Sequence, residues 1–291
     1  MSDEVVSVEV VRHFCHIAAR RLGVGIDPKV AALVAGRVAK RLKVLQLPLD
    51  DYLSRLDEDE HCDEVVGFLD VMRPPPLPFF ARAADHAQLY ARLGRWLDQG
   101  RRRFRLWSAG CGSGEEPYAM ALTVLKALVA ARIPPDNIDL KILATDLSPR
   151  VLARGRHGVF DEEQFRSMRS SLREHYFFEV TDGLAIDPEV KAHVVFRRLN
   201  LAHPPFPMTG PMDAIFFSEG LVPLLPRARR CATEAARGIL AADGVFCTGL
   251  DEEDDCVDAC LDDRQAGEEE GAGELLWADG LRGSRRSPGN C

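Results

Sequence analysis

The chain has 291 residues, of which 46% are hydrophobic, and a formal net charge of −8 at pH 7. This length and apolar content allow one large or two modest domains with a substantial core. No run approaches the roughly 20 apolar residues that span a bilayer, and the first residues, MSDEVVSVEVVRH, are acidic where a signal peptide is basic. We therefore expect a cytoplasmic protein with no membrane insertion.

The charge is concentrated at the C-terminus. Residues 251–291 contain 13 acidic and 4 basic side chains, a net of −9, which leaves about +1 for the rest of the chain. This composition predicts an acidic, mostly disordered tail. We expect no nucleic-acid partner, and no metal site, because the eight cysteines include no C-x-x-C pair.

Residues 1–73 have the pattern of a small helical domain. The segment VEVVRHFCHIAARRLG repeats apolar residues at helical spacing, and KVAALVAGRVAKRLKVLQL does so after a helix start at Asp27-Pro28. Two shorter helical segments follow before Arg73-PPPLP, a stiff linker. The second helix carries a basic cluster that is either a solvated face or a docking surface for an acidic partner, formed by Arg37, Lys40, Arg41 and Lys43.

The second domain, residues 74–250, contains a glycine-rich stretch, FRLWSAGCGSGEEPYAM, at residues 104–120. A short apolar run precedes Gly110, Gly112 and Gly114, and a helical pattern follows Glu115, Glu116 and Pro117. A strand, a glycine turn and a helix in this order let the backbone approach a nucleotide closely. Carboxylates at the helix start would repel a phosphate. They suit S-adenosylmethionine, which has ribose hydroxyls and a positively charged sulfonium.

The next expected strand, IDLKILATD, ends in Asp146 and is followed by Ser148-Pro149 at a helix start. An acid at this position of a doubly wound sheet accepts hydrogen bonds from ribose hydroxyls. Alternatively, Asp146 or Ser148 is the N-cap of the helix.

Residues 158–178 have a helical pattern, and Asp182-Gly183 is a turn signal for a hairpin in a small β-subdomain at about 178–199. Strands near 104, 140, 194, 213 and 245 predict a mostly parallel α/β sheet.

The string WSAGCGSGEEPYAMA closely resembles the cofactor loop of the CheR-type chemoreceptor glutamate methyltransferases, which usually reads WSAGCSTGEEPYS. The resemblance implies a Rossmann-like class I methyltransferase domain, preceded by the helical domain. It implies S-adenosylmethionine as cofactor, with Glu116 near its methionine end and Asn200-Leu201 near its adenine. It also places Glu219 and Gly220 at the cofactor, and the basic helix against an acidic helical region of a chemoreceptor-like partner.

Three family signatures are altered. Where the family reads N-x-T-x-F-F-R, this chain has Pro75, Leu77 and Ala81, and Arg82 is the nearest arginine, expected to orient the acceptor carboxylate. Where the family has C-R-N-V-x-I-Y-F, residues 217–224 read FSEGLVPL. The acidic tail replaces the closing hairpin. Three functions therefore stay open: an active protein-glutamate O-methyltransferase, a binding module for S-adenosylmethionine without catalysis, and a methyltransferase with another acceptor.

Overall fold

The computed structural model describes residues 11–26, 31–59, 61–73, 75–217 and 224–248. They fall into two compact units whose bounds differ from the expected boundary at residue 73. One unit contains the described residues up to His16, Ile26 and residues 31–55, and the other contains the described residues of 17–25 and 56–249. The acidic tail lies outside the described residues, so its expected disorder stays a prediction. Among the described helices, none is long and apolar enough to cross a membrane.

The smaller unit is helical, as its periodicity predicts. Residues 11–17 form a helix that continues as η1 (Ala18–Leu22) in the larger unit, and α2 (Ala31–Leu45) and the start of α3 (Leu49–Glu58) complete it. The rings of Phe14 and Tyr52 stack at 6.4 Å between centroids. Asp50 and Asp51 lie in the first turn of α3, where they complement the positive end of the helix dipole.

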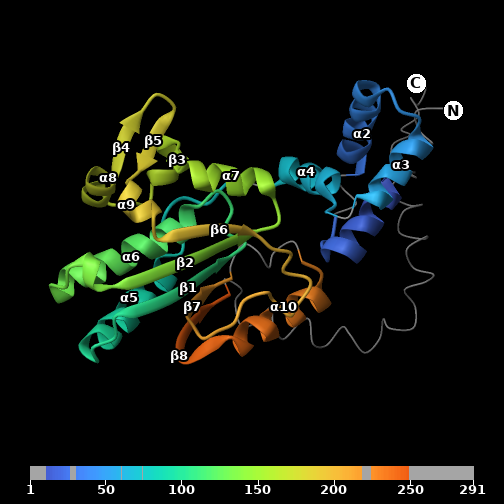
Figure 1. Ribbon diagram of the computed structural model, residues 1–291. Helices are drawn as coiled ribbons and strands as arrows, with labels where there is room; N and C mark the ends of the chain where they lie inside the picture. Colours follow the sequence, from blue (N-terminus) through green and yellow to red (C-terminus); the bar gives the residue numbers. More distant parts are fainter. Residues whose placement is uncertain (1–10, 27–30, 60, 74, 218–223, 249–291) are drawn as a thin grey trace, which may run out of the picture. The chain divides into compact units, whose positions relative to one another are not determined.

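The larger unit is built on a five-stranded sheet in the order β6-β2-β1-β7-β8, with every neighbouring pair parallel (Figure 1). This confirms the predicted parallel α/β sheet. The order places β1 at the centre and changes the winding direction beside it, and ligands bind at such a switch point, outside the carboxyl ends of the strands. The strands are β1 (Arg103–Ala109), β2 (Asp139–Asp146), β6 (Val194–Arg198), β7 (Met212–Phe216) and β8 (Leu240–Cys247).

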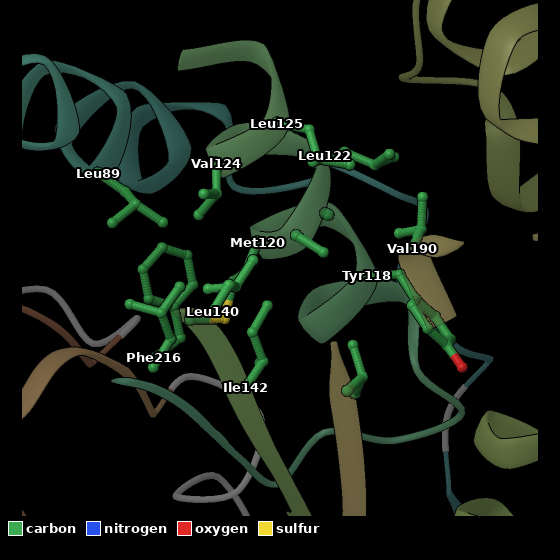
Figure 2. Close-up of a cluster of buried hydrophobic side chains, with 14 of the residues drawn as sticks. Leu89, Tyr118, Met120, Leu122, Val124, Leu125, Leu140, Ile142, Val190 and Phe216 are labelled. Carbon is green, nitrogen blue, oxygen red and sulfur yellow. The ribbon is translucent and has the colours of Figure 1, made fainter. Parts of the chain in front are cut away.

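Helices join or flank these strands: α5 (Ala83–Asp98), α6 (Glu115–Ala131), α7 (Pro149–His157) and α10 (Pro226–Gly238). Helix α4 (Asp63–Met72) precedes them in the chain. Helix α6 is buried along most of its length. Figure 2 shows its side chains between Leu89 of α5 and the strand residues Leu140, Ile142 and Phe216. This apolar contact fixes the start of α6 relative to the ends of β1 and β2.

A second sheet of three antiparallel strands, in the order β3-β5-β4, accounts for the small β-subdomain. Strands β4 (Phe177–Val180) and β5 (Gly183–Ile186) form the hairpin expected at Asp182-Gly183. The small sheet does not have the expected bounds of 178–199: it begins with β3 (Val159–Phe160), and β6 belongs to the main sheet.

The prediction of a long helical segment over 158–178 was also wrong. That stretch has few apolar anchors, and its helical parts are limited to η4 (Glu162–Phe165) and α8 (Ser170–Tyr176). A third short helix, α9 (Pro188–Lys191), precedes β6.

Candidate functional site

The glycine turn leads from the end of β1 to the start of α6, and its backbone requires glycine. Gly110, Gly112 and Gly114 have φ angles of 82°, 52° and 107°, in the left-handed region that side chains disfavour. The amides of Gly110 and Cys111 both donate to the carbonyl of Thr145, at 2.8 Å each. The turn is therefore held against the carboxyl end of β2, beside Asp146.

Asp146 accepts more hydrogen bonds than the other acids of the site, and its side chain is only 3% exposed. Its carboxylate accepts hydrogen bonds from the amides of Gly112 at 3.2 Å and Ser148 at 2.9 Å. Both of its oxygens also accept from the guanidinium of Arg73, at 3.1 and 3.0 Å. The N-cap of α7 is Ser148, whose hydroxyl accepts from Val151. Arg73 thus occupies both oxygens of the Asp146 carboxylate, which is also the two-point contact that a ribose diol needs.

The two acids at the start of α6 have different partners. Glu116 accepts from the hydroxyl of Ser108 at 2.6 Å, which holds it beside the end of β1. Glu115 is buried and accepts from the hydroxyl of Ser113 at 2.8 Å and from the side-chain amide of Gln164. Burial raises the pKa of Glu115 above its ordinary value, and these donors and the main-chain amide oppose that rise. Glu115 therefore stabilises the turn through its buried hydrogen bonds, while Glu116 lies beside the turn.

The field around the turn is negative. Burial raises the pKa of the Cys111 thiol well above 9, and the carboxylates of Asp146, Glu116 and Glu115 raise it further. Each of these acids thus acts electrostatically on the middle of the turn. Such a field favours a positively charged group, for example a sulfonium, and disfavours phosphate.

Arg82 lies at the N-cap position of α5. Its side chain is 33% exposed, and its Nε is 2.5 Å from a carboxylate oxygen of Asp85, one turn further along the helix. Cys247, at the end of β8, is acted on electrostatically both by this pair and by Glu116 beside the glycine turn. Burial raises the pKa of Cys247 to about 12, Asp85 and Glu116 raise it, and Arg82 lowers it. Arg82 and Glu116 therefore both lie within electrostatic range of the end of β8.

The remaining expected residues have less direct positions. The side chain of Asn200 donates to the carbonyl of Arg21 at 3.0 Å and accepts from the amide of Ala202, so it connects two backbone segments. Leu201 is buried beside it. Glu219 and Gly220 lie outside the described residues. On α2, Lys40, Arg41 and Lys43 are exposed, and the side chain of Arg37 is not among those described.

Two residues of the site were missed by sequence reasoning. Arg73 follows α4 at the start of a proline run, and nothing in that pattern predicts its pairing with Asp146. Gln164 donates to Glu115, its side-chain oxygen accepts from the amide of Asp161, and its carbonyl accepts from the amide of Phe79. The pattern around Gln164 indicates a helix, which hides the fact that it joins the glycine turn to the Phe79–Phe80 segment.

Comparison with known proteins gives a consistent result. Residues 78–257 match the family described as CheR methyltransferase, SAM binding domain. Chemotaxis protein methyltransferase 2 of Pseudomonas aeruginosa is 30% identical over 238 residues, which cover 80% of this chain and 82% of that protein. The chemotaxis protein methyltransferase of Escherichia coli is 30% identical over 213 residues, which cover 70% of each chain. That of Borreliella burgdorferi is 27% identical over 207 residues, 69% of this chain and 72% of that protein.

Proposed function

The chain belongs to the CheR methyltransferase family, and from this premise we propose that it transfers methyl groups from S-adenosylmethionine to glutamate side chains of a chemoreceptor-like protein. One arrangement carries the proposal. The glycine turn, Asp146 and Glu116 meet where β1 and β2 end, and their carboxylates make the field negative. The relatives named as chemotaxis methyltransferases support the same activity.

In this proposal each residue has a distinct task toward the cofactor. Asp146 accepts the ribose hydroxyls, the glycine turn lets the backbone lie against the nucleoside, and Glu116 lies toward the methionine end. Asn200 and Leu201 lie toward the adenine. For Glu219 and Gly220, which lie outside the described residues, we propose contact with the cofactor because the family resemblance implies it. Bound S-adenosylmethionine supplies an electrophilic methyl group on a sulfonium.

The acceptor requires little acid–base chemistry. A glutamate with a reference pKa of about 4.3 is already ionised near pH 7, so no general base has to remove a proton. The protein has to align the donor and acceptor and exclude water, which can contribute roughly 7 to 11 kcal/mol. Arg82 is the residue proposed to orient the acceptor carboxylate. Its partial exposure supports that role, as does the electrostatic effect of both Arg82 and Glu116 on Cys247 at the end of β8.

The partner is proposed to be an acidic, helical region of the receptor. The support for this is the exposed basic face of α2, with Arg37, Lys40, Arg41 and Lys43 as its expected residues. Charge complementarity of this kind mainly raises the association rate. We also propose the cytoplasm as the place of this reaction, in keeping with the family.

A second function, cofactor binding without methyl transfer, is favoured by one specific observation. The positions that the family fills with polar residues hold Pro75, Leu77 and Ala81, and Leu77 is an exposed apolar side chain. The guanidinium of Arg82, one position later, is paired with Asp85. This reading keeps the cofactor contacts and removes the acceptor contacts.

One experiment tests both functions. Calorimetric titration with S-adenosylhomocysteine measures cofactor-site binding, and transfer of labelled methyl from S-adenosylmethionine to a receptor signalling fragment measures activity. Asp146→Ala should weaken S-adenosylhomocysteine binding by roughly 1.5 to 3 kcal/mol, the scale of a hydrogen bond to a charged group. Unchanged affinity in that variant contradicts the site. Binding in the wild type without any methyl transfer selects the second function.

A further inference from the structure

Arg73 occupies the same face of Asp146 that the proposed function gives to the ribose. Its two terminal nitrogens lie 3.1 and 3.0 Å from the two carboxylate oxygens, a paired geometry that a guanidinium shares with a vicinal diol. The two amides of Gly112 and Ser148 supply the other hydrogen bonds of this carboxylate. A diol can therefore reach both oxygens only where the guanidinium now lies.

Asp70 provides a second acceptor for the same guanidinium. Its side chain is 4% exposed, and its Oδ1 is 3.9 Å from Nε of Arg73. The other oxygen of Asp70 accepts from the hydroxyl of Ser148 at 2.6 Å, whereas Oδ1 is buried without a hydrogen-bond partner. A buried carboxylate oxygen left in this state is costly, so it favours any donor that can approach it.

Arg73 can change partners without disturbing the core. It is the residue after the last turn of α4, with an extended backbone, and its side chain is 35% exposed. Asp70 lies three residues earlier, the spacing at which side chains on a helix meet. We therefore expect a rotation of the partly exposed Arg73 side chain to move its guanidinium from Asp146 toward Asp70, while the backbone stays in place.

We propose that Arg73 competes within the protein for the ribose carboxylate, and that Asp70 receives its guanidinium when the cofactor binds. This inference rests on the proposed function, because it needs Asp146 to be the ribose acceptor. The affinity for the cofactor therefore depends on the exchange of Arg73 from Asp146 to Asp70. The cofactor gains two hydrogen bonds to Asp146 only after the ion pair with Arg73 is given up, and the pair with Asp70 offsets part of that loss.

The test is calorimetric titration with S-adenosylhomocysteine for wild type, Arg73→Met, Asp70→Asn and the double variant. Arg73→Met keeps the length of the side chain and removes the competing charge, so affinity should rise about tenfold, a modest value because the pair is partly exposed. Asp70→Asn should weaken binding about threefold when Arg73 is present. It should have no effect in the Arg73→Met background, and this non-additivity is the signature of a shared partner.

A matched control is Arg198→Gln. The side chain of Arg198 also ties the segment around α4 to the end of the sheet, through Asp63 and the carbonyls of His61 and Leu147. Arg198 pairs with Asp146 between β6 and β2, but its guanidinium makes no hydrogen bond or ion pair with the Asp146 carboxylate. Its removal should leave the affinity for S-adenosylhomocysteine unchanged. If Arg73→Met unfolds too easily for calorimetry, Arg73→Lys is used, which keeps the positive charge but cannot donate to both carboxylate oxygens in the paired geometry of a guanidinium. The rise in melting temperature on adding S-adenosylhomocysteine then replaces the titration.

The outcomes separate this inference from the proposed function. Tighter binding by Arg73→Met, abolished when Asp146→Asn is added, supports both. Binding by Arg73→Met that is equal to or weaker than wild type overturns the competition. If Asp146→Asn still weakens binding in that case, the proposed ribose site stands alone. If Asp146→Asn has no effect in either background, the ribose assignment fails, and this inference fails with it.

Discussion

The two sides of the candidate site are held in place by different means. On the glycine-turn side, Asp146 and Glu115 are buried carboxylates with main-chain or side-chain donors on nearly every oxygen. On the α5 side, Arg82 and Asp85 form a partly exposed pair one helical turn apart. Buried networks are costly to rearrange, while exposed pairs contribute little and exchange partners easily. We infer that the proposed cofactor side is preorganised, apart from the partner exchange of Arg73, whereas the proposed acceptor side can adapt.

The largest effect should come from breaking the rigid side at Gly114. A Cβ at this residue would lie 3.1 Å from the Tyr118 ring and 3.2 Å from the Cα of Gly155, with φ at +107°. Gly114→Ala therefore adds backbone strain to overpacking, and should lower the free energy of unfolding by about 3 to 4 kcal/mol. It should also weaken S-adenosylhomocysteine binding. Chemical denaturation and calorimetry measure the two effects.

The control for this change is Gly94→Ala in α5, where a Cβ would meet nothing within 4 Å. Replacing a helical glycine by alanine usually stabilises by up to about 1 kcal/mol. A stability loss in Gly94→Ala like that of Gly114→Ala would mean that any added methyl group harms this fold, and the special conformation of the turn would not be the cause.

The next effect concerns His86, which anchors the acceptor side to the core. Its ring packs against Phe80 and Phe216 and lies 3.2 Å from the hydroxyl of Thr123. Burial lowers the pKa of His86 to about 4, Asp85 opposes this shift and Arg82 adds to it. Because the unfolded imidazole takes up its proton near pH 6.5, stability should fall by about 3 kcal/mol as pH drops from 6.5 to 4.

This pH dependence can be assigned to one residue with His86→Phe, which keeps an aromatic ring and cannot titrate. The slope of unfolding free energy against pH should flatten between 6.5 and 4 in this variant, measured by denaturation at several pH values. An equal slope in wild type and variant would assign the acid sensitivity to other groups.

A smaller effect should follow from removing Arg82. If its guanidinium orients the acceptor carboxylate, Arg82→Ala should raise the KM for a receptor fragment about tenfold, the value of one charge-assisted hydrogen bond. The affinity for S-adenosylhomocysteine should not change, because the proposed cofactor contacts lie on the glycine-turn side. Arg95→Ala, in the last turn of the same helix, is the control. Loss of cofactor affinity in Arg82→Ala would contradict the division into two sides.

The sequence was most informative where one continuous segment carries several roles. The glycine turn and the acids at residues 110–116 could be predicted because strand, turn and helix follow one another directly. The five strands of the sheet were also found, since each is a short apolar run. The partners of those acids were not found. Arg73 and Asp146 are 73 residues apart in the chain, and only folding brings them together. The small sheet was misplaced because its two-residue strand β3 is too short to show a period.

The smallest effect should come from α2, a helix of the smaller unit. Lys40 and Lys43 are exposed and three residues apart, so they share a face of the helix. Attraction of exposed charges is screened over about 8 Å at physiological ionic strength. Lys40→Glu combined with Lys43→Glu should therefore raise the KM for an acidic receptor fragment about threefold at low salt, on the scale of exposed ion pairs. The difference should shrink at high salt, and cofactor affinity should stay constant.

The control for that variant is the pair Lys126→Glu and Lys141→Glu, which changes the net charge equally at exposed positions of α6 and β2. Methyl transfer is measured for the three proteins at two salt concentrations. If both double variants show the same rise in KM, only the net charge of the protein matters, and α2 is a solvated face. A rise confined to Lys40 and Lys43, and largest at low salt, assigns the docking to this helix, since a local surface responds to where the charges lie as well as to their sum.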